Sequence, residues 1–412
     1  MAMLVSCVLA ASAAWRAGAA RLLAKYAGES LSADNARAAV RMSPSDAETH
    51  SSLGLTLYNL KDARGAVEEF SRSVSLRPRD YFLWVQLGRA REEAGDAEGS
   101  VRALLEAERL APFYSEPRWQ YGNVLYRRGR FDEAFAEMRR ASESNPSLYP
   151  VFVDLAWGTY GGDTRAIERV ASPRTDAERF ALARLFARKG NADDALALFR
   201  TVNELDAGDR KTFLRELLNA KQFRAAYEVW AGGRESGGEG NTRRDAGVGR
   251  ITEPGFEGRV NTFEAGFGWR QEREYEGVTL SLDTQTHNSG ARSLLVEWGG
   301  HASPGVTIVS QLVLVEPGAR YLLRFHARTE NVKTGGPPLL VVTDASSAEA
   351  RDLAQSHTLP QGTTGWQEYE AEFAAPPKTE AVLVGLRRQP CDSNPCPMFG
   401  RVWLDDFTLV KQ

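Results

Sequence analysis

The chain has 412 residues, of which 42% are hydrophobic and 25% charged, and its formal net charge is −3. These values exclude a mostly disordered chain, a collagen-like fibre and a protein that crosses the membrane many times. The near-neutral charge argues against nucleic acid as a partner, because binding to phosphates needs a basic face. Alanine, arginine and glutamate concentrate in the part up to position 230, whereas glycine, valine and threonine concentrate after position 250. Length and this asymmetry predict a multidomain protein.

Residues 1–15 are apolar or small, and the first charge is Arg16. The run is shorter than the roughly 20 residues of a membrane span, and it lacks the basic start of a signal peptide. A lipobox-like stretch ends at Cys7, and an A-x-A cleavage pattern occupies 11–13. We interpret the segment as the remnant of a signal or anchor segment that would attach the N-terminus to a membrane. The alternative is a buried first helix of the array that follows.

The chain has three cysteines, Cys7, Cys391 and Cys396. The last two lie close together in the sequence with no third or fourth ligand nearby, which makes a poor zinc site. We therefore expect a disulfide between Cys391 and Cys396, a bond typical of oxidising compartments. Together with the N-terminal segment, it predicts an extracytoplasmic location, in a bacterial periplasm or cell envelope.

Prolines, glycines and other small residues recur at one fixed spacing within 16–230. The members are Pro44, Pro78, Pro112 and Pro146, then Gly54, Gly88 and Gly122, then Ala66, Ser100 and Ala134. Small residues let two helices approach closely, and proline ends the second helix. This 34-residue register resembles the tetratricopeptide repeat, which implies an all-α helical-repeat solenoid. Units 47–80, 81–114 and 115–148 fit well, the register weakens after Pro146, and we expect about six helix pairs.

The tetratricopeptide resemblance also implies a groove lined by the first helix of each unit. The positions that line it in this family correspond here to Phe82, Arg89, Trp119, Asn123, Tyr126, Arg127 and Arg184. Arginine, asparagine and aromatic side chains suit an extended peptide or a protein tail, because guanidinium groups pair with carboxylates. The alternative is that the arginines form a solvated face and the aromatics complete the core.

The stretch 231–250 is rich in glycine and in charged side chains, so we expect a flexible linker between domains. From position 251 the hydrophobic pattern alternates, and in 321–328 the side chains of Tyr321, Leu323, Phe325 and Ala327 should face the core. The strands that we expect, separated by turn sequences and without helices between them, predict an all-β jelly-roll sandwich over 251–412. They are 279–283, 293–298, 306–315, 321–328, 339–343, 366–373, 381–387 and 401–409.

The sandwich resembles galactose-binding-like jelly rolls of the carbohydrate-binding-module type. The resemblance rests on Phe256-Glu257, Phe263-Glu264 and Phe267-Gly-Trp269 near the start, and on the closing 403–407 stretch Trp-Leu-Asp-Asp-Phe. It implies a glycan-binding face, for which the candidates are Arg324, His326, Arg387, Trp403, Trp366 and Trp298. It also implies a structural calcium held by Glu257, Asp405 and Asp406. The alternative for the aspartates is that they cap a turn or pair with an arginine.

No catalytic constellation is recognisable in the sequence: the histidines show no metal-ligand spacing, and neither a phosphate-binding loop nor a nucleophile elbow occurs. We therefore expect no enzyme and no cofactor beyond calcium. The hypothesis is a non-catalytic envelope scaffold that binds a protein through the groove and a glycan through the jelly roll, in polysaccharide assembly or export. The rival is a purely structural or protein-interaction protein. Exposure of Arg324, His326 and Trp403 favours the first interpretation, and their burial favours the second.

Overall fold

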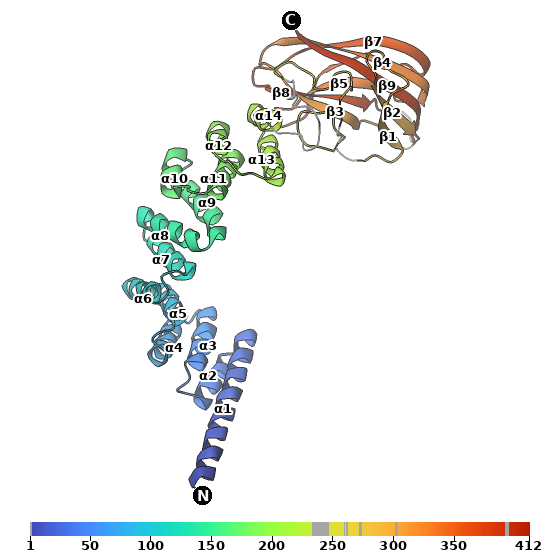
Figure 1. The fold of residues 1–412 in the computed structure, drawn as a ribbon. Helices are drawn as coiled ribbons and strands as arrows, with labels where there is room; N and C mark the ends of the chain where they lie inside the picture. Colours follow the sequence, from blue (N-terminus) through green and yellow to red (C-terminus); the bar gives the residue numbers. More distant parts are fainter. Residues whose placement is uncertain are drawn as a thin grey trace. The chain divides into compact units, whose positions relative to one another are not determined.

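A computed structural model of the chain describes residues 2–232, 247–258, 260, 263–271, 274–300, 304–391 and 395–412 (Figure 1). The side chains of residues 2–11 and 13 are not described. The chain divides into two compact units, Met1–Leu185 and Phe186–Gln412. Most of the predicted linker, residues 233–246, lies outside the described part, so the linker stays a prediction.

Helices occupy the described residues up to 231 and follow one another as antiparallel pairs. A short 3-10 turn at Pro146–Leu148 precedes the ninth helix. The helices are α1 (Ala2–Ser30), α2 (Ala33–Met42), α3 (Ala47–Asn59), α4 (Ala63–Leu76), α5 (Tyr81–Glu93), α6 (Ala97–Leu110), α7 (Ser115–Arg127), α8 (Phe131–Ser144), α9 (Tyr149–Thr159), α10 (Thr164–Ala171), α11 (Asp176–Arg188), α12 (Ala192–Phe199), α13 (Ala207–Asn219) and α14 (Phe223–Ala231).

Glycines at the 34-residue period mark where the two helices of a pair touch. A Cβ at Gly54 would lie 3.0 Å from the Phe70 ring, and a Cβ at Gly88 would lie 2.7 Å from Cγ of Leu104. At Gly122 the obstacle is Cγ of Met138, at 2.9 Å. Each glycine thus makes room for a large apolar residue of the partner helix. The helical-repeat solenoid predicted from the spacing is confirmed.

The number of helix pairs differs from the expectation, whereas the register weakens after Pro146 as expected. The described residues contain seven helix pairs rather than about six, because α1 pairs with α2 ahead of the first regular unit. The 34-residue period extends into α9, where Ala156 is fully buried at the position 34 residues after Gly122. It fails in α10, which has only eight residues. In the described residues, no helix is both long and apolar enough to span a membrane.

The second unit combines the last helices with the sandwich. On α14, Tyr227 and Trp230 pack against Phe267, with ring centroids 5.1 and 5.7 Å apart. A Cβ at Gly266 would lie 2.3 Å from the Trp230 ring, so glycine is needed for this contact. Phe267 and the adjacent Gly266 therefore hold α14 against the β domain.

The sandwich has a five-stranded sheet in the order β1-β2-β9-β4-β7 and a four-stranded sheet in the order β3-β8-β5-β6. All strand pairs in the described residues are antiparallel, and β9 lies between β2 and β4. The strands are β1 (Val278–Asp283), β2 (Ser293–Gly299), β3 (Thr307–Leu314), β4 (Arg320–Thr334), β5 (Pro338–Asp344), β6 (Arg351–Gln355), β7 (Gly362–Ala374), β8 (Ala381–Arg388) and β9 (Met398–Lys411). All eight predicted strands are present, and β6 was not predicted.

The core of the sandwich lies between the two sheets. Tyr321, Leu323, Phe325 and Ala327 of β4 are buried there, as the alternation predicts. Phe325 stacks on Phe407 with ring centroids 5.4 Å apart. Because this alternation assigns one side of β4 to the core, the even-numbered side chains from 322 to 328 point to the outer face of the five-stranded sheet.

Candidate functional site

The groove candidates with free surface lie on α5 and α7, which are the first helices of two well-matched units. Phe82 is 47% exposed near the start of α5, and Trp119 and Asn123 are half-buried on α7. Glu48 and Glu116 occupy the position of Phe82 in the preceding and the following unit, so acidic side chains flank this aromatic ring in sequence register. Phe82, Trp119 and Asn123 supply two aromatic rings and an amide group for a peptide chain.

The other groove candidates link neighbouring helices. The Arg89 guanidinium lies 5.3 Å from the Tyr58 ring centroid, and Arg127 Nε donates to Glu92 Oε1 at 3.2 Å. Tyr126 packs on Phe131 and its hydroxyl lies 3.0 Å from Thr159 Oγ1.

Arg184, the last of the groove candidates, lies 5.8 Å from the Phe180 ring centroid on its own helix. The contacts of Arg89, Tyr126 and Arg127 join first helices of successive units, so these side chains shape the groove wall more than they offer free donors.

Leu55 is a groove residue that was not predicted from the sequence. It is 40% exposed on α3, at the position that Arg89 and Asn123 occupy one and two units later. The same period that located the glycines would have found it, because it applies to exposed positions as well as to buried ones. Leu55 and Phe82 are thus exposed apolar side chains on neighbouring first helices.

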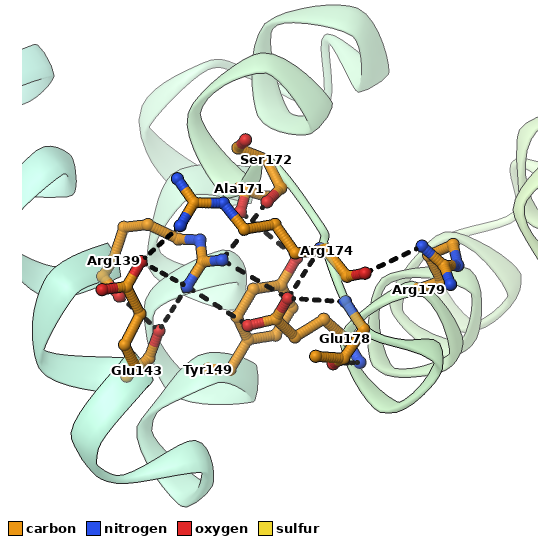
Figure 2. A network of polar contacts seen from close by, with 10 residues as sticks. Arg139, Glu143, Tyr149, Ala171, Ser172, Arg174, Glu178 and Arg179 are labelled. Atoms are coloured by element: carbon orange, nitrogen blue, oxygen red, sulfur yellow. Dashed lines mark hydrogen bonds and ion pairs between the residues drawn. The ribbon is translucent and has the colours of Figure 1, made fainter.

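A buried ionic network holds the irregular part of the array (Figure 2). Arg139 of α8 is only 6% exposed, and its Nη1 lies 3.2 Å from Oε1 of Glu178 on α11. Oε2 of Glu178 accepts hydrogen bonds from the backbone N–H groups of Arg174 and Thr175 at 2.7 and 3.1 Å. Arg174 in turn reaches Glu143 at 2.8 Å. The network ties the connection after α10 to α8, so it is a structural feature where the 34-residue register is lost.

The glycan candidates Arg324, His326 and Trp366 share the outer face of the five-stranded sheet. Arg324 is exposed and lies 3.7 Å from Glu370, its cross-strand neighbour on β7. His326 is opposite Glu368, and the strand alternation places half-buried Trp366 on the same face as Glu368. The face therefore offers an imidazole, a guanidinium, carboxylates and one partly exposed indole.

Trp403 lies on this face as expected, but it is only 3% exposed. Its Nε1 donates to Oδ2 of Asp283 at 2.7 Å, and the Arg328 guanidinium lies 5.3 Å from its ring centroid. A ring that is covered by a cation and bound through its N–H cannot act as an open stacking platform. Exposure therefore does not decide between the two interpretations: Arg324 is exposed and His326 is half-buried, but Trp403 is buried.

Two other glycan candidates lie elsewhere. Trp298 is 3% exposed and belongs to the core between the sheets, so its assignment to a glycan-binding face is wrong. It has the same parity along β2 as Leu294 and Val296, which are core residues. Arg387 lies on β8 of the four-stranded sheet, where it pairs with Asp352 at 2.8 Å. Neither residue can join a site with Arg324.

The three carboxylates proposed for calcium gather around the turn that precedes β2. Asp405 accepts backbone N–H groups from Asn288 and Asp406, both at 2.8 Å, and Asp406 accepts the Asn288 side-chain amide at 2.7 Å. Glu257 accepts the N–H of Ala291 at 2.7 Å. Burial raises the pKa of Asp405. These contacts are those of turn caps, and no group of three acidic, histidine or cysteine side chains in the described part of the chain has metal-binding geometry. The calcium stays a prediction.

Cys391 and Cys396 form the expected disulfide, with Cα atoms 6.0 Å apart. The bond closes a loop between β8 and β9. Fully buried Arg388 lies beside it and donates to the Cys396 carbonyl at 3.1 Å and to Thr334 Oγ1 at 2.9 Å. The loop is thus pinned to the end of β4, which stabilises one end of the sandwich.

Comparison with known proteins identifies the class of the helical part. Residues 85–148 match the tetratricopeptide repeat family. A stretch of 100 residues is 28% identical to the peroxisomal targeting signal receptor of Candida albicans SC5314, covering 23% of this chain and 17% of that protein. The chain therefore spans less than a fifth of this curated relative, and its helical part carries tetratricopeptide repeats.

Solved structures of low identity resemble each part. A structure of Pseudomonas aeruginosa PilF has 17% identity and a TM-score of 0.35, and covers 52% of this chain and 98% of its own. A structure of MamA has 18% identity and a TM-score of 0.27, and covers 47% of this chain and 90% of its own. A CBM4 structure has 13% identity and a TM-score of 0.30, and covers 40% of this chain and 100% of its own. The assignment of the fold rests on the arrangement of the helices and strands.

Proposed function

We propose that the chain is a non-catalytic scaffold of the cell envelope that holds a protein partner in its tetratricopeptide groove and contacts a glycan with its sandwich. The protein-binding half is supported by the repeats themselves and by the accessible Leu55, Phe82, Trp119 and Asn123 on successive first helices. An extended peptide with apolar side chains fits these residues, because they combine accessible apolar groups with an amide.

The observation that carries the glycan half is the group formed by Arg324, His326 and Trp366 on the outer face of the five-stranded sheet. Sugars are bound by a planar ring against which a pyranose stacks and by charged or polar groups that bond its hydroxyls. Trp366 supplies the ring, and Arg324, His326 and Glu368 supply the polar groups. The disulfide loop supports an oxidising location, where polysaccharide is assembled or exported.

Binding of the full chain to a glycan array tests the sandwich. We expect the substitution Trp366→Ala to reduce binding to the best glycan at least about tenfold, about 1.4 kcal/mol. Arg324→Ala should reduce it by a similar factor. The matched control is Arg351→Ala, which removes an exposed arginine from the four-stranded sheet. If no glycan is retained, or if all three variants bind alike, the sandwich is a structural module.

Selection of peptides on the immobilised chain tests the groove. We expect Phe82→Ser to weaken the selected peptides about tenfold, because the ring is lost from the middle of the contact. Phe113→Ser is the control, since Phe113 is an 86% exposed ring outside the first helices. Equal losses in the two variants would contradict a groove site.

A further inference from the structure

An exposed apolar stripe follows the first helix. Trp15, Leu22 and Tyr26 are 73%, 73% and 59% exposed, and we call these three residues the α1 stripe. At 3.6 residues per turn, positions 15, 22 and 26 fall on one side of the helix. In the part of unit 1 whose side chains are described, nothing covers these three side chains to the degree seen for core residues.

The opposite side of α1 is already used. Ala20, Ala24 and Ala27 are at most 2% exposed, and they face the neighbouring helices α2 and α3. Ser52 of α3 donates its hydroxyl to the Ala24 carbonyl at 2.7 Å, and Arg21 Nε is bound to Asp46 Oδ2 at 2.7 Å. The helix is therefore anchored to the array through small residues and presents its large apolar residues outward.

From Trp15 to Tyr26, the charges that α1 carries beside the stripe are positive, and exposed Glu29 follows in the last turn of the helix. Arg16, Arg21 and Lys25 are the charged residues of positions 1–28, and Glu29 is the first acidic one. Arg16 and Lys25 are exposed and lie about a quarter turn to either side of the stripe. On the packed elements, Asp46 is already bound to Arg21 and Arg77, and Glu48 lies 3.5 Å from Arg77.

We propose that the α1 stripe lies on the surface of a lipid bilayer that contains anionic headgroups. Tryptophan and tyrosine prefer the interface between water and acyl chains, and lysine and arginine beside an apolar face reach phosphate groups from there. The three residues of the stripe include no amide or acidic side chain that could form specific hydrogen bonds with a protein partner. Positive flanks also repel the same flanks of a second copy, which favours lipid over self-association.

This helix would lie in the plane of the membrane surface and hold the array against it. The inference goes beyond the groove and the glycan face, and its failure would leave both of them standing. It differs from the expectation of an anchor in residues 1–15, because the residues that contact lipid extend to Tyr26 and remain part of the folded array.

Flotation of the full chain with vesicles tests the proposal. The vesicles are phosphatidylcholine alone and phosphatidylcholine mixed with phosphatidylglycerol. We expect binding to the mixed vesicles, weakened by salt, and little binding to the neutral ones. The triple variant Trp15→Ser, Leu22→Ser, Tyr26→Ser should lower the partition coefficient at least about tenfold, about 1.4 kcal/mol. The double variant Arg16→Gln, Lys25→Gln should lower it about fivefold for each charge removed.

A matched control removes exposed apolar groups elsewhere in the same unit, through Leu105→Ser, Phe113→Ser and Val151→Ser. It should bind as the unchanged chain does, and equal helical circular dichroism of all variants shows that they are folded. Binding of the stripe variant at the original strength would assign lipid contact to residues outside the stripe and overturn the proposal. So would a chain that ignores both vesicles, or one that forms a dimer which the stripe substitutions dissociate, without any vesicle binding.

Discussion

The contacts that stabilise the helical array join residues close in the sequence, whereas those that stabilise the sandwich join residues far apart in the sequence. In the array, Ser73 of α4 bonds to the Ala47 carbonyl of its own unit, and each pair otherwise packs on the next. In the sandwich, the last strand, β9, pairs with the much earlier strand β2, as between Leu294 and Leu404. A repeat array distributes its stability among neighbours, whereas a sheet closed by its last strand folds as a whole. The same substitution should therefore act locally in one region and throughout the other.

The largest expected effect is at Gly400 of β9. Its φ is +110°, and a Cβ there would lie 2.6 Å from the carbonyl oxygen of Asn331 on β4. We expect Gly400→Ala to destabilise the protein by about 3 kcal/mol, because backbone strain and a clash with the main chain act together. Hydrogen exchange measured by mass spectrometry should show lost protection in all nine described strands.

The control for Gly400 is Gly365→Ala on β7, where a Cβ meets nothing within 4 Å. It should leave exchange unchanged. Loss of protection confined to β9 and β4 would contradict the expectation that the sandwich unfolds as one unit.

A smaller and local effect is expected at Gly88 of α5. Its Cβ would lie 2.7 Å from Cγ of Leu104, so Gly88→Ala should cost about 1–3 kcal/mol through overpacking. Faster exchange should be limited to α5, α6 and the helices that adjoin them. Gly158→Ala on α9, in open space, should instead stabilise by about 0.5–1 kcal/mol because alanine favours the helix. Faster exchange in every helix after Gly88→Ala would contradict the local behaviour.

The regular elements could be predicted because each follows a short-range rule. The 34-residue spacing located Gly54, Gly88 and Gly122, and alternation assigned Tyr321 and Phe325 to the core. These positions depend on neighbours in the same helix pair or on the same strand, so the sequence pattern contains the information. The helical-repeat fold and the sandwich could therefore be predicted from the sequence alone.

The rest depends on groups that are distant in the sequence. Trp403 was expected to be open, but Asp283 and Arg328 from two other strands bind and cover it. The strand β6 reads Arg-Asp-Leu-Ala-Gln, which has no β-branched residue, and it exists as an edge because β5 pairs with it. Arg139 looked like any helix-surface arginine until Glu178, 39 residues later, was placed beside it.

The smallest expected effect is a pH dependence of opposite sign in the two regions. A hydrogen bond from Arg21 is the main cause that lowers the pKa of Asp46, so its stabilisation is present above the unfolded value and is lost as the pH falls. Burial raises the pKa of Asp405, so its contribution to stability is present at low pH and is lost as the pH rises through the folded pKa.

We expect the stability difference between the unchanged chain and Asp46→Asn to grow from about pH 3 to 6, and the difference from Asp405→Asn to shrink. Urea unfolding at several pH values in this range measures both differences. Arg21→Gln should reduce the first slope, because Arg77 still lies beside Asp46, and should leave the second unchanged. Slopes of the same sign would contradict the assignment of Asp46 to an ion-paired cap and of Asp405 to a desolvated one.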